Sequence, residues 1–156
     1  MTAFRTITQF ASPEQTCAFA QSLGKTLGPG DVILLEGGIG AGKTHFARCL
    51  IQSLLIQPED VPSPTFTLVQ EYETEKGALW HADLYRLSGP DEIIELGLTE
   101  AFETAICLVE WPDRLGDLRP DGAMTLTFSD GETEDSRHVE IFAETALWAR
   151  RLEPLV

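Results

Sequence analysis

The stretch that decides the fold lies at residues 32–44 and reads Val-Ile-Leu-Leu-Glu-Gly-Gly-Ile-Gly-Ala-Gly-Lys-Thr. Its first four residues form a continuous apolar run, which is typical of a parallel strand buried on both faces. A glycine-rich segment follows at once, and Phe46, Leu50 and Leu54 then recur at helical spacing. The sequence therefore predicts a buried strand, a glycine loop and an amphipathic helix in immediate succession.

Residues 37–44 fit the pattern G-x-x-x-x-G-K-S/T of a phosphate-binding loop, or P-loop. Glycines let the backbone fold tightly, so that consecutive N–H groups point at phosphate oxygens beside the positive end of a helix dipole. Lys43 is then expected to reach the β- and γ-phosphates, and the Thr44 hydroxyl to ligate Mg²⁺. The pattern predicts a site for ATP and Mg²⁺. Its expected nucleotide-binding residues are Gly37, Gly38, Ile39, Gly40, Ala41, Gly42, Lys43 and Thr44.

Two acids are candidates for the magnesium side of this site. Glu110 ends the apolar run at 105–109, where P-loop proteins commonly place an acid near Mg²⁺. Asp83 belongs to the more mixed strand at 78–85, and a solvated strand end is the alternative for both acids. Thr65 lies in a proline-stiffened loop, where it is either a switch that senses the γ-phosphate or part of a rigid surface turn.

The rest of the chain predicts helices and strands that surround this motif. Ser12 is expected to cap a helix that has proline at its first position, and a hairpin is expected across residues 75–77. We expect helices near residues 13–27, 46–54, 88–102 and 147–152, and strands near 32–35, 66–72, 78–85, 105–109, 123–128 and 138–142. The length suits one domain over residues 1–156. The predicted class is α/β, a P-loop NTPase-like three-layer sandwich with a mixed, largely parallel central sheet.

Composition limits the classes of function. The chain has 25 Asp and Glu against 11 Lys and Arg, a net charge of -14, so any nucleic acid is expected to be held by another protein. Cys17, Cys49 and Cys107 are odd in number and widely spaced in apolar surroundings, which favours buried reduced thiols over a disulfide framework or a zinc site. Reduced thiols point to the cytoplasm. With no secretory segment or membrane-length apolar run, the sequence predicts a soluble protein.

Four segments together carry a resemblance. They are Glu-Gly-Gly-Ile-Gly-Ala-Gly-Lys-Thr at 36–44, Val-Pro-Ser-Pro-Thr-Phe-Thr-Leu-Val at 61–69, His-Ala-Asp-Leu-Tyr-Arg-Leu at 81–87 and Cys-Leu-Val-Glu-Trp-Pro at 107–112. In order, spacing and chain length they resemble the bacterial TsaE (YjeE) family, the ATPases of tRNA threonylcarbamoyladenosine biosynthesis. The resemblance implies a P-loop ATPase that works with the tRNA threonylcarbamoyltransferase subunits to modify adenosine 37 of tRNA.

The resemblance also assigns roles to single residues. It gives Lys43 to phosphate, Thr44 and Glu110 to Mg²⁺, and Asp83 and Thr65 to the catalytic side of the γ-phosphate. Trp111, in the last segment, and Arg137, in the C-terminal hairpin, are assigned to the nucleotide. Gly38 departs from the family, which usually has aspartate after the first glycine, so the role of that carboxylate is not carried over.

Two other functions stay open. A small-molecule P-loop kinase should have a lid with several arginines, whereas residues 113–119 offer only Arg114 and Arg119. A switch protein would bind ATP to control docking without hydrolysing it. A GTPase would need a guanine-reading Asn-Lys-x-Asp motif, and the chain has no asparagine.

The histidines are too scattered to predict a transition-metal site, so packing or surface roles are expected for them. They are His45, His81 and His138.

Overall fold

The computed structural model describes residues 3–38, 42–64 and 67–155. The elements in chain order are β1 (Phe4–Phe10), α1 (Pro13–Gly24), β2 (Val32–Gly37), α2 (Lys43–Leu54), β3 (Val69–Thr74), β4 (Gly77–Asp83), α3 (Pro90–Glu95), α4 (Leu98–Thr104), β5 (Ile106–Glu110), the 3₁₀ helix η1 (Pro112–Leu118), β6 (Met124–Asp130), β7 (Arg137–Ala143) and α5 (Ala146–Leu152). The predicted strand and helix on either side of the glycine loop are therefore confirmed as β2 and α2.

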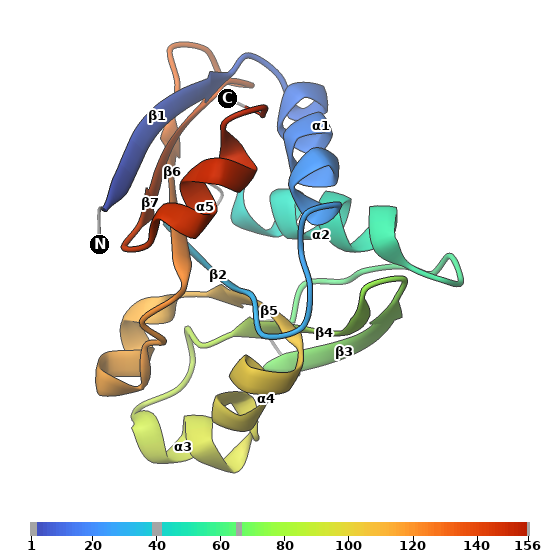
Figure 1. Cartoon of the computed structure of the whole chain (residues 1–156), viewed down its shortest axis with the longest axis vertical. Helices are drawn as coiled ribbons and strands as arrows, with labels where there is room; N and C mark the ends of the chain where they lie inside the picture. The colour runs from blue at the N-terminus through green and yellow to red at the C-terminus, as the bar shows by residue number, and fades with distance from the viewer. Residues whose placement is uncertain (1–2, 39–41, 65–66, 156) are drawn as a thin grey trace.

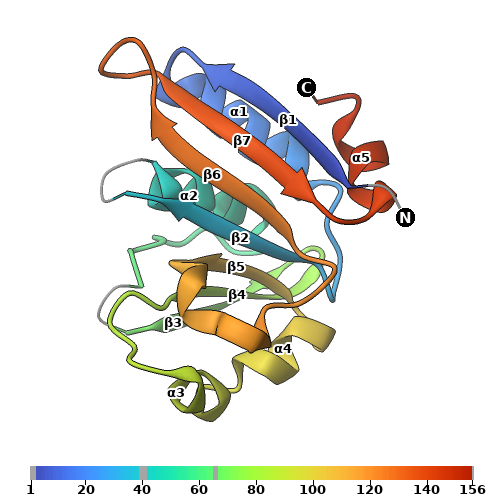
Figure 2. The same ribbon diagram turned by 90° about the vertical axis from the view of Figure 1, so that its left-hand side faces the viewer.

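The strands form one seven-stranded sheet in the order β1-β7-β6-β2-β5-β4-β3 (Figure 2). Its centre is parallel, because β6, β2, β5 and β4 pair side by side in the same direction. The outer strands β7, β1 and β3 pair antiparallel with their neighbours. The expected mixed sheet with a parallel centre is thus confirmed, and the antiparallel strands at both sides supply the mixture.

Helices cover both faces of the sheet and follow the alternation of its side chains (Figure 1). Ile33 and Leu35 of β2 pack in a cluster with α1, α2 and α5, whereas Val32 and Leu34 pack in a second cluster with α3 and α4. A strand that is buried on both faces needs apolar side chains on both, so residues 32–35 of β2 form a continuous apolar run. None of the described helices is long and apolar enough to cross a membrane.

The ends of the helices show where local sequence signals decide the structure. Ser12 caps α1 as predicted, with its Oγ accepting from the Gln15 N–H at 3.2 Å. The predicted helix over 88–102 is divided into α3 and α4, because Gly97 adopts a φ of 82° that ends one helix and starts the next. Glycine adopts this left-handed conformation without the steric cost that other residues meet.

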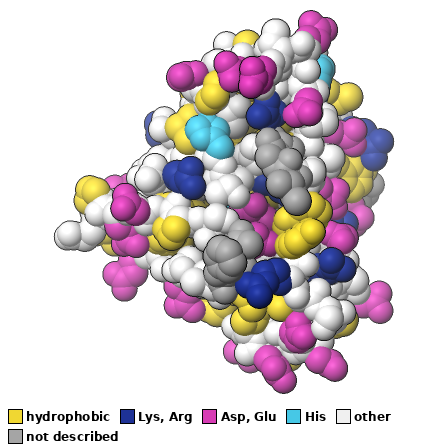
Figure 3. Space-filling model, turned by 180° about the vertical axis from the view of Figure 1, so that it is seen from behind, with side chains coloured by type: hydrophobic (Ala, Val, Ile, Leu, Met, Phe, Trp, Pro, Cys, Tyr) yellow, Lys and Arg dark blue, Asp and Glu magenta, His cyan; other side chains and the backbone are white. Residues whose placement is uncertain are grey.

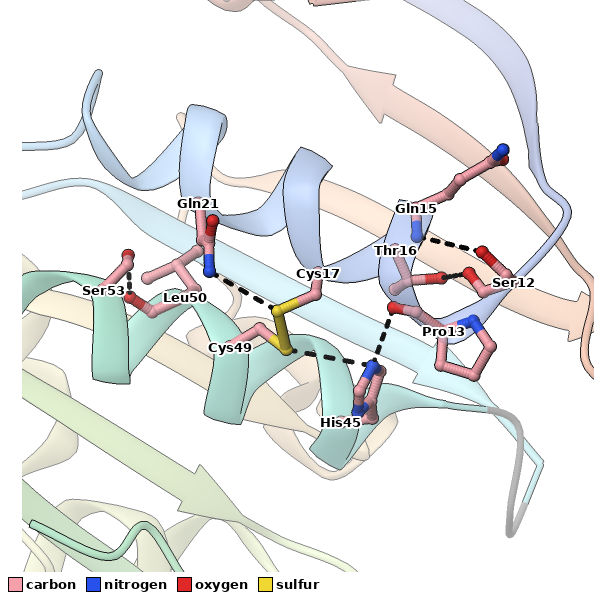
Figure 4. Close-up of a disulfide and its surroundings, with 10 residues drawn as sticks. All are labelled: Ser12, Pro13, Gln15, Thr16, Cys17, Gln21, His45, Cys49, Leu50 and Ser53. Carbon is pink, nitrogen blue, oxygen red and sulfur yellow. Dashed lines mark hydrogen bonds between the residues drawn. A yellow bond between two sulfur atoms is a disulfide. The ribbon is translucent and has the colours of Figure 1, made fainter.

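The prediction of three reduced cysteines is wrong for two of them. Cys17 of α1 and Cys49 of α2 form a disulfide, with Cα atoms 5.2 Å apart, while Cys107 is a free, buried thiol (Figure 4). Spacing in sequence did not reveal the pair, because the two residues meet only when α1 packs against α2. The cross-link joins the helix that follows the glycine loop to the helix beside it.

Candidate functional site

The carboxyl ends of three parallel strands meet at one edge of the sheet. The register pairs Leu35 of β2 with Glu110 of β5, and Glu110 with Asp83 of β4. Beyond Gly37 the chain returns along the sheet as α2, which begins at Lys43. Ligands of open α/β sheets bind outside the carboxyl ends of the strands, so this edge is the candidate site.

Lys43 is held inside the turn between β2 and α2. Its Nζ donates to the Gly37 carbonyl at 2.7 Å and lies 3.6 Å from the centroid of the Trp111 ring. Only 5% of Lys43 is exposed. The glycine at the start of α2, Gly42, has a φ of 106°, a conformation that L side chains rarely adopt. Lys43 therefore directs its ammonium group from the start of α2 back toward the end of β2.

Acids surround this ammonium group. Burial lowers the pKa of Lys43, and the negative charges of Glu110, Asp83 and Asp113 oppose that shift in decreasing order. Three carboxylates near one buried lysine leave the site with a local excess of negative charge. Such an excess favours the binding of a cation.

Thr44 and Glu110 form the core of the polar cluster. The Thr44 hydroxyl donates to Glu110 Oε1 at 2.9 Å and lies 3.2 Å from Oε2. His81 Nε2 lies 2.7 Å from Glu110 Oε2, so the carboxylate has partners on two sides. Only 2% of Glu110 and none of His81 is exposed. Glu110 is therefore no solvated strand end. Of the surface and packing roles expected for His81, the surface role is wrong, because its imidazole is buried and contacts Glu110.

Asp83 connects the end of β4 to the loop that precedes β3. It is 4% exposed, its Oδ1 accepts from the Tyr85 N–H at 2.9 Å, and its own N–H donates to the Leu68 carbonyl at 2.8 Å. The Leu68 N–H in turn donates to the Pro64 carbonyl at 2.7 Å. Thr65, the predicted switch residue, lies outside the described residues. The described ends of its loop are nevertheless joined to the strand that bears Asp83.

Trp111 lies between Lys43 and Tyr85. Its ring centroid is 4.8 Å from that of Tyr85, and its backbone has a φ of 58° and a ψ of 55°. Non-glycine residues in this left-handed region cost on the order of 1–3 kcal/mol and cluster at functional sites. The Trp111 ring contacts the Lys43 ammonium group and the Tyr85 ring, and these contacts stabilise Trp111 in this conformation.

A small cavity lies next to the start of α2. Arg137 of β7 packs against Gly42, and a Cβ at Gly42 would lie 3.5 Å from its Nε. The Arg137 Nη1 donates to the carbonyls of Glu134 and Ser136, each at 2.8 Å. The cavity measures about 130 Å³ and is lined by Pro13, Thr16, Gly42, His45, Asp135 and Arg137. The structure thus brings Arg137 to the glycine loop, although they are almost a hundred residues apart in sequence.

Most of the predicted site residues that are described meet at this edge. They are Gly37, Gly42, Lys43, Thr44, Asp83, Glu110, Trp111 and Arg137. Ile39, Gly40 and Ala41 lie outside the described residues, as Thr65 does. A Cβ at Gly38 would meet no described atom within 4 Å, so the described part of the structure does not require glycine at this position.

Two members of the cluster were missed from sequence. Asp113 follows the last motif, and its charge reaches Lys43. His81 had a usable signal, because it stands two residues before Asp83 on one strand and therefore faces the same side of the sheet. The shared face was the clue to its contact with Glu110.

Comparison with known proteins identifies a family model and relatives that match this chain. The family model described as threonylcarbamoyl adenosine biosynthesis protein TsaE matches residues 10–139. The chain is 42% identical to a tRNA threonylcarbamoyladenosine biosynthesis protein TsaE of Rickettsia bellii over 70% of this chain and 76% of that protein. It is 43% identical to the TsaE of Rickettsia felis over 64% of this chain but 58% of that protein.

A solved structure extends the likeness to nearly the whole chain. The crystal structure of Bacillus subtilis YdiB aligns with a TM-score of 0.77 and 28% identity, covering 99% of this chain and 96% of that one. The alignment therefore includes α5, which lies outside the family-model match, and β1, of which the family model matches only Phe10. On the match over residues 10–139 and the identities to its relatives, this chain belongs to the TsaE family of threonylcarbamoyl adenosine biosynthesis proteins.

Proposed function

We propose that this chain is a Mg²⁺-dependent P-loop ATPase that acts with partner proteins in the threonylcarbamoyladenosine modification of tRNA. The observation that carries the proposal is the cluster of Lys43, Thr44 and Glu110 between β2 and α2, in which Lys43 and Glu110 are buried and Thr44 is half-buried. The strand order β2-β5-β4 and the loop between β2 and α2 support a P-loop NTPase-like sandwich. Family membership supports the pathway and a cytoplasmic place of action, where tRNA is modified.

Phosphate binding would use the start of α2 and its lysine. Backbone N–H groups at a helix N-terminus attract anions, and α2 runs for 12 residues from Lys43. In the present structure the Lys43 ammonium group contacts the Gly37 carbonyl. A phosphate oxygen would replace that carbonyl as a stronger, charged acceptor. Lys43 is thus already buried at the phosphate position and needs only a local change of partner.

The oxygen donors of the cluster suit a magnesium ion. Thr44 and Glu110 offer a hydroxyl and a carboxylate, and Mg²⁺ commonly takes one or two protein oxygens together with phosphate and water. These two residues would hold the ion, which would neutralise charge that develops on the transferring phosphoryl group. Asp83 lies beside Glu110 in the register and is buried enough to orient a water molecule and accept its proton. Thr65 would complete this side of the site.

The nucleoside end would lie on the opposite side of the loop. Arg137 and the cavity beside Gly42 adjoin the start of α2, where the phosphate chain would leave toward the ribose. Trp111 would hold the Lys43 ammonium group from the other side. The cavity of about 130 Å³ adjoins the start of α2 and would receive part of the nucleoside.

Transfer RNA would reach this chain only through partners. The net charge is -14, and acidic side chains are spread over the face shown in Figure 3. A phosphate backbone would be repelled by this charge at physiological salt unless a basic partner bridged the two. The proposed partners are the tRNA threonylcarbamoyltransferase subunits.

The kinase alternative is less well supported. Arg114 Nη2 donates to the Tyr85 carbonyl at 3.3 Å, and Arg119 Nη2 donates to Glu36 Oε1 at 2.6 Å. A kinase lid would have to release both contacts before these arginines could reach a transferring phosphoryl group. An ATP-dependent switch without hydrolysis differs from the proposal only in turnover.

The test is phosphate release from ATP, measured with and without the partner subunits and tRNA. We expect release that the partners stimulate, and its loss in Lys43→Ala, because a charge-assisted phosphate contact disappears. Lys25→Ala is the matched control, since Lys25 is exposed at the end of α1 and carries the same charge. Transfer of phosphate to a small acceptor would favour the kinase. Tight ATP binding without release would favour the switch, and unchanged turnover in Lys43→Ala would refute the P-loop assignment.

A further inference from the structure

His81 is buried beside the polar cluster, where Glu110 is its hydrogen-bond partner. None of its surface is exposed, and its Nε2 lies 2.7 Å from Glu110 Oε2. The register pairs His81 with Leu108 and Asp83 with Glu110, so the imidazole reaches diagonally across to the end of β5. Burying a polar ring is costly unless it forms hydrogen bonds. The contact with Glu110 offsets this cost for His81.

The two oxygens of Glu110 have different surroundings. Oε1 is the closer to the Thr44 hydroxyl, at 2.9 Å, while Oε2 is the one that His81 approaches. A glutamate side chain has several rotatable bonds, and a single partner would leave the carboxylate free to turn. Partners on both oxygens fix its plane and keep Oε1 toward the Thr44 side.

The hydrogen bond also fixes which nitrogen carries the proton. A carboxylate oxygen accepts, so Nε2 of His81 donates. The other nitrogen, Nδ1, is buried and has no hydrogen-bond partner within residues 3–38, 42–64 and 67–155. The one N–H of this tautomer is directed at the Glu110 carboxylate, which supplies the acceptor that a buried donor requires. The orientation therefore indicates a role toward Glu110.

We propose that His81 is a positioning residue, which holds the Glu110 carboxylate in the orientation that receives a divalent cation beside Thr44. The inference rests on the proposed function, since it assumes that the cation binds at this cluster. Groups that hold a metal ligand in place commonly contribute about 10- to 100-fold to metal affinity. We expect the loss of His81 to weaken cation binding by a factor in that range.

The experiment measures Mn²⁺ affinity by electron paramagnetic resonance, with the full chain and saturating ADP. His81→Leu removes the donor, His81→Gln keeps an amide N–H that reaches toward Glu110, and His81→Asn carries an amide too short to do so. Leu108→Met is the control for disturbance of the core, because Leu108 is the fully buried cross-strand neighbour of His81. ADP affinity in EDTA and thermal unfolding are measured for each variant.

The expected result is a Mn²⁺ dissociation constant raised about 10- to 100-fold in His81→Leu and His81→Asn, largely restored in His81→Gln and unchanged in Leu108→Met. The affinity of the His81 variants for ADP in EDTA should match the wild type, and their ATP turnover should recover at high metal-ion concentration. A general loss of structure would instead lower ADP affinity and would not be reversed by added metal ion. If His81→Leu does not fold, the comparison of Gln with Asn decides. Equal Mn²⁺ affinity in the folded variants and the wild type overturns the role of His81 alone. Absence of nucleotide-dependent Mn²⁺ binding in the wild type overturns the magnesium site as well.

Discussion

Reduction of the Cys17–Cys49 disulfide should destabilise this protein by a calculable amount. The two cysteines are 32 residues apart in sequence, and their bond joins α1 to α2 (Figure 4). In the chain-entropy description, a cross-link over a loop of that length restricts the unfolded chain and stabilises the native state by roughly 3.7 kcal/mol at 25 °C. The native helices keep their packing after reduction, because Leu23 and Leu50 belong to the same buried cluster.

The calculated loss converts into a shift of the melting temperature. Unfolding entropies of roughly 2.1 cal/mol/K per residue give about 0.33 kcal/mol/K for a chain of 156 residues. A loss of roughly 3.7 kcal/mol therefore lowers Tm by roughly 11 °C. This is large enough to separate from scatter in a thermal melt followed by circular dichroism.

The assay compares melts with and without a phosphine reductant. Before reduction the denatured wild type should expose one titratable thiol, Cys107, and after reduction all three cysteines. Cys17→Ser with Cys49→Ser is the control, which should melt like the reduced wild type and ignore the reductant. A wild-type Tm that stays unchanged when the thiol count proves full reduction would refute this reasoning.

Three further outcomes are expected. Glu110→Gln should keep appreciable nucleotide binding and lose Mg²⁺-dependent turnover, with Glu103→Gln on the exposed end of α4 as control; a wild-type magnesium titration would count against the role of Glu110. Thr65→Ala should leave ADP affinity nearly intact while reducing partner-stimulated hydrolysis and tRNA modification, and unimpaired modification in a reconstituted system would overturn the switch role. Burial raises the pKa of the Cys107 thiol to about 12, so this thiol should resist alkylation in native protein at pH 8. The same shift predicts a contribution to the free energy of unfolding that is retained below pH 9 and lost as the pH rises toward 12. Denaturant titrations at several pH values measure this loss.

The central part of the fold and most of the site were predictable because their signals are local. The run at 32–35, the glycine loop and the helix after it lie together in sequence, so no distant contact was needed to find them. Acids at the ends of neighbouring strands could also be placed, because parallel strands end at the same edge. From the sequence, Glu110 and Asp83 were candidates for the magnesium side of the site, and the structure brings both acids near Lys43.

The features that were missed depend on contacts between distant segments. Strand β1 was not predicted, since its inward positions include Thr6 and Thr8 while Ile7 points outward, which hides the alternation typical of a half-buried strand. Its pairing partner is β7, at the other end of the chain. The disulfide likewise depends on how α1 packs against α2. Only the folded chain contains these relations.

The charges around Lys43 explain why a divalent cation would be required for binding as well as for chemistry. Glu110, Asp83 and Asp113 all act on this ammonium group, so the region that would receive polyphosphate already carries their negative charge. Two unit charges 4 Å apart interact by about 4 kcal/mol at an effective dielectric constant of 20, so one lysine does not offset three carboxylates and a polyphosphate. A Mg²⁺ ion between Thr44 and Glu110 would add two positive charges beside the acid that acts most strongly on Lys43. On the proposed function, the same acids that repel free ATP thus select its magnesium complex.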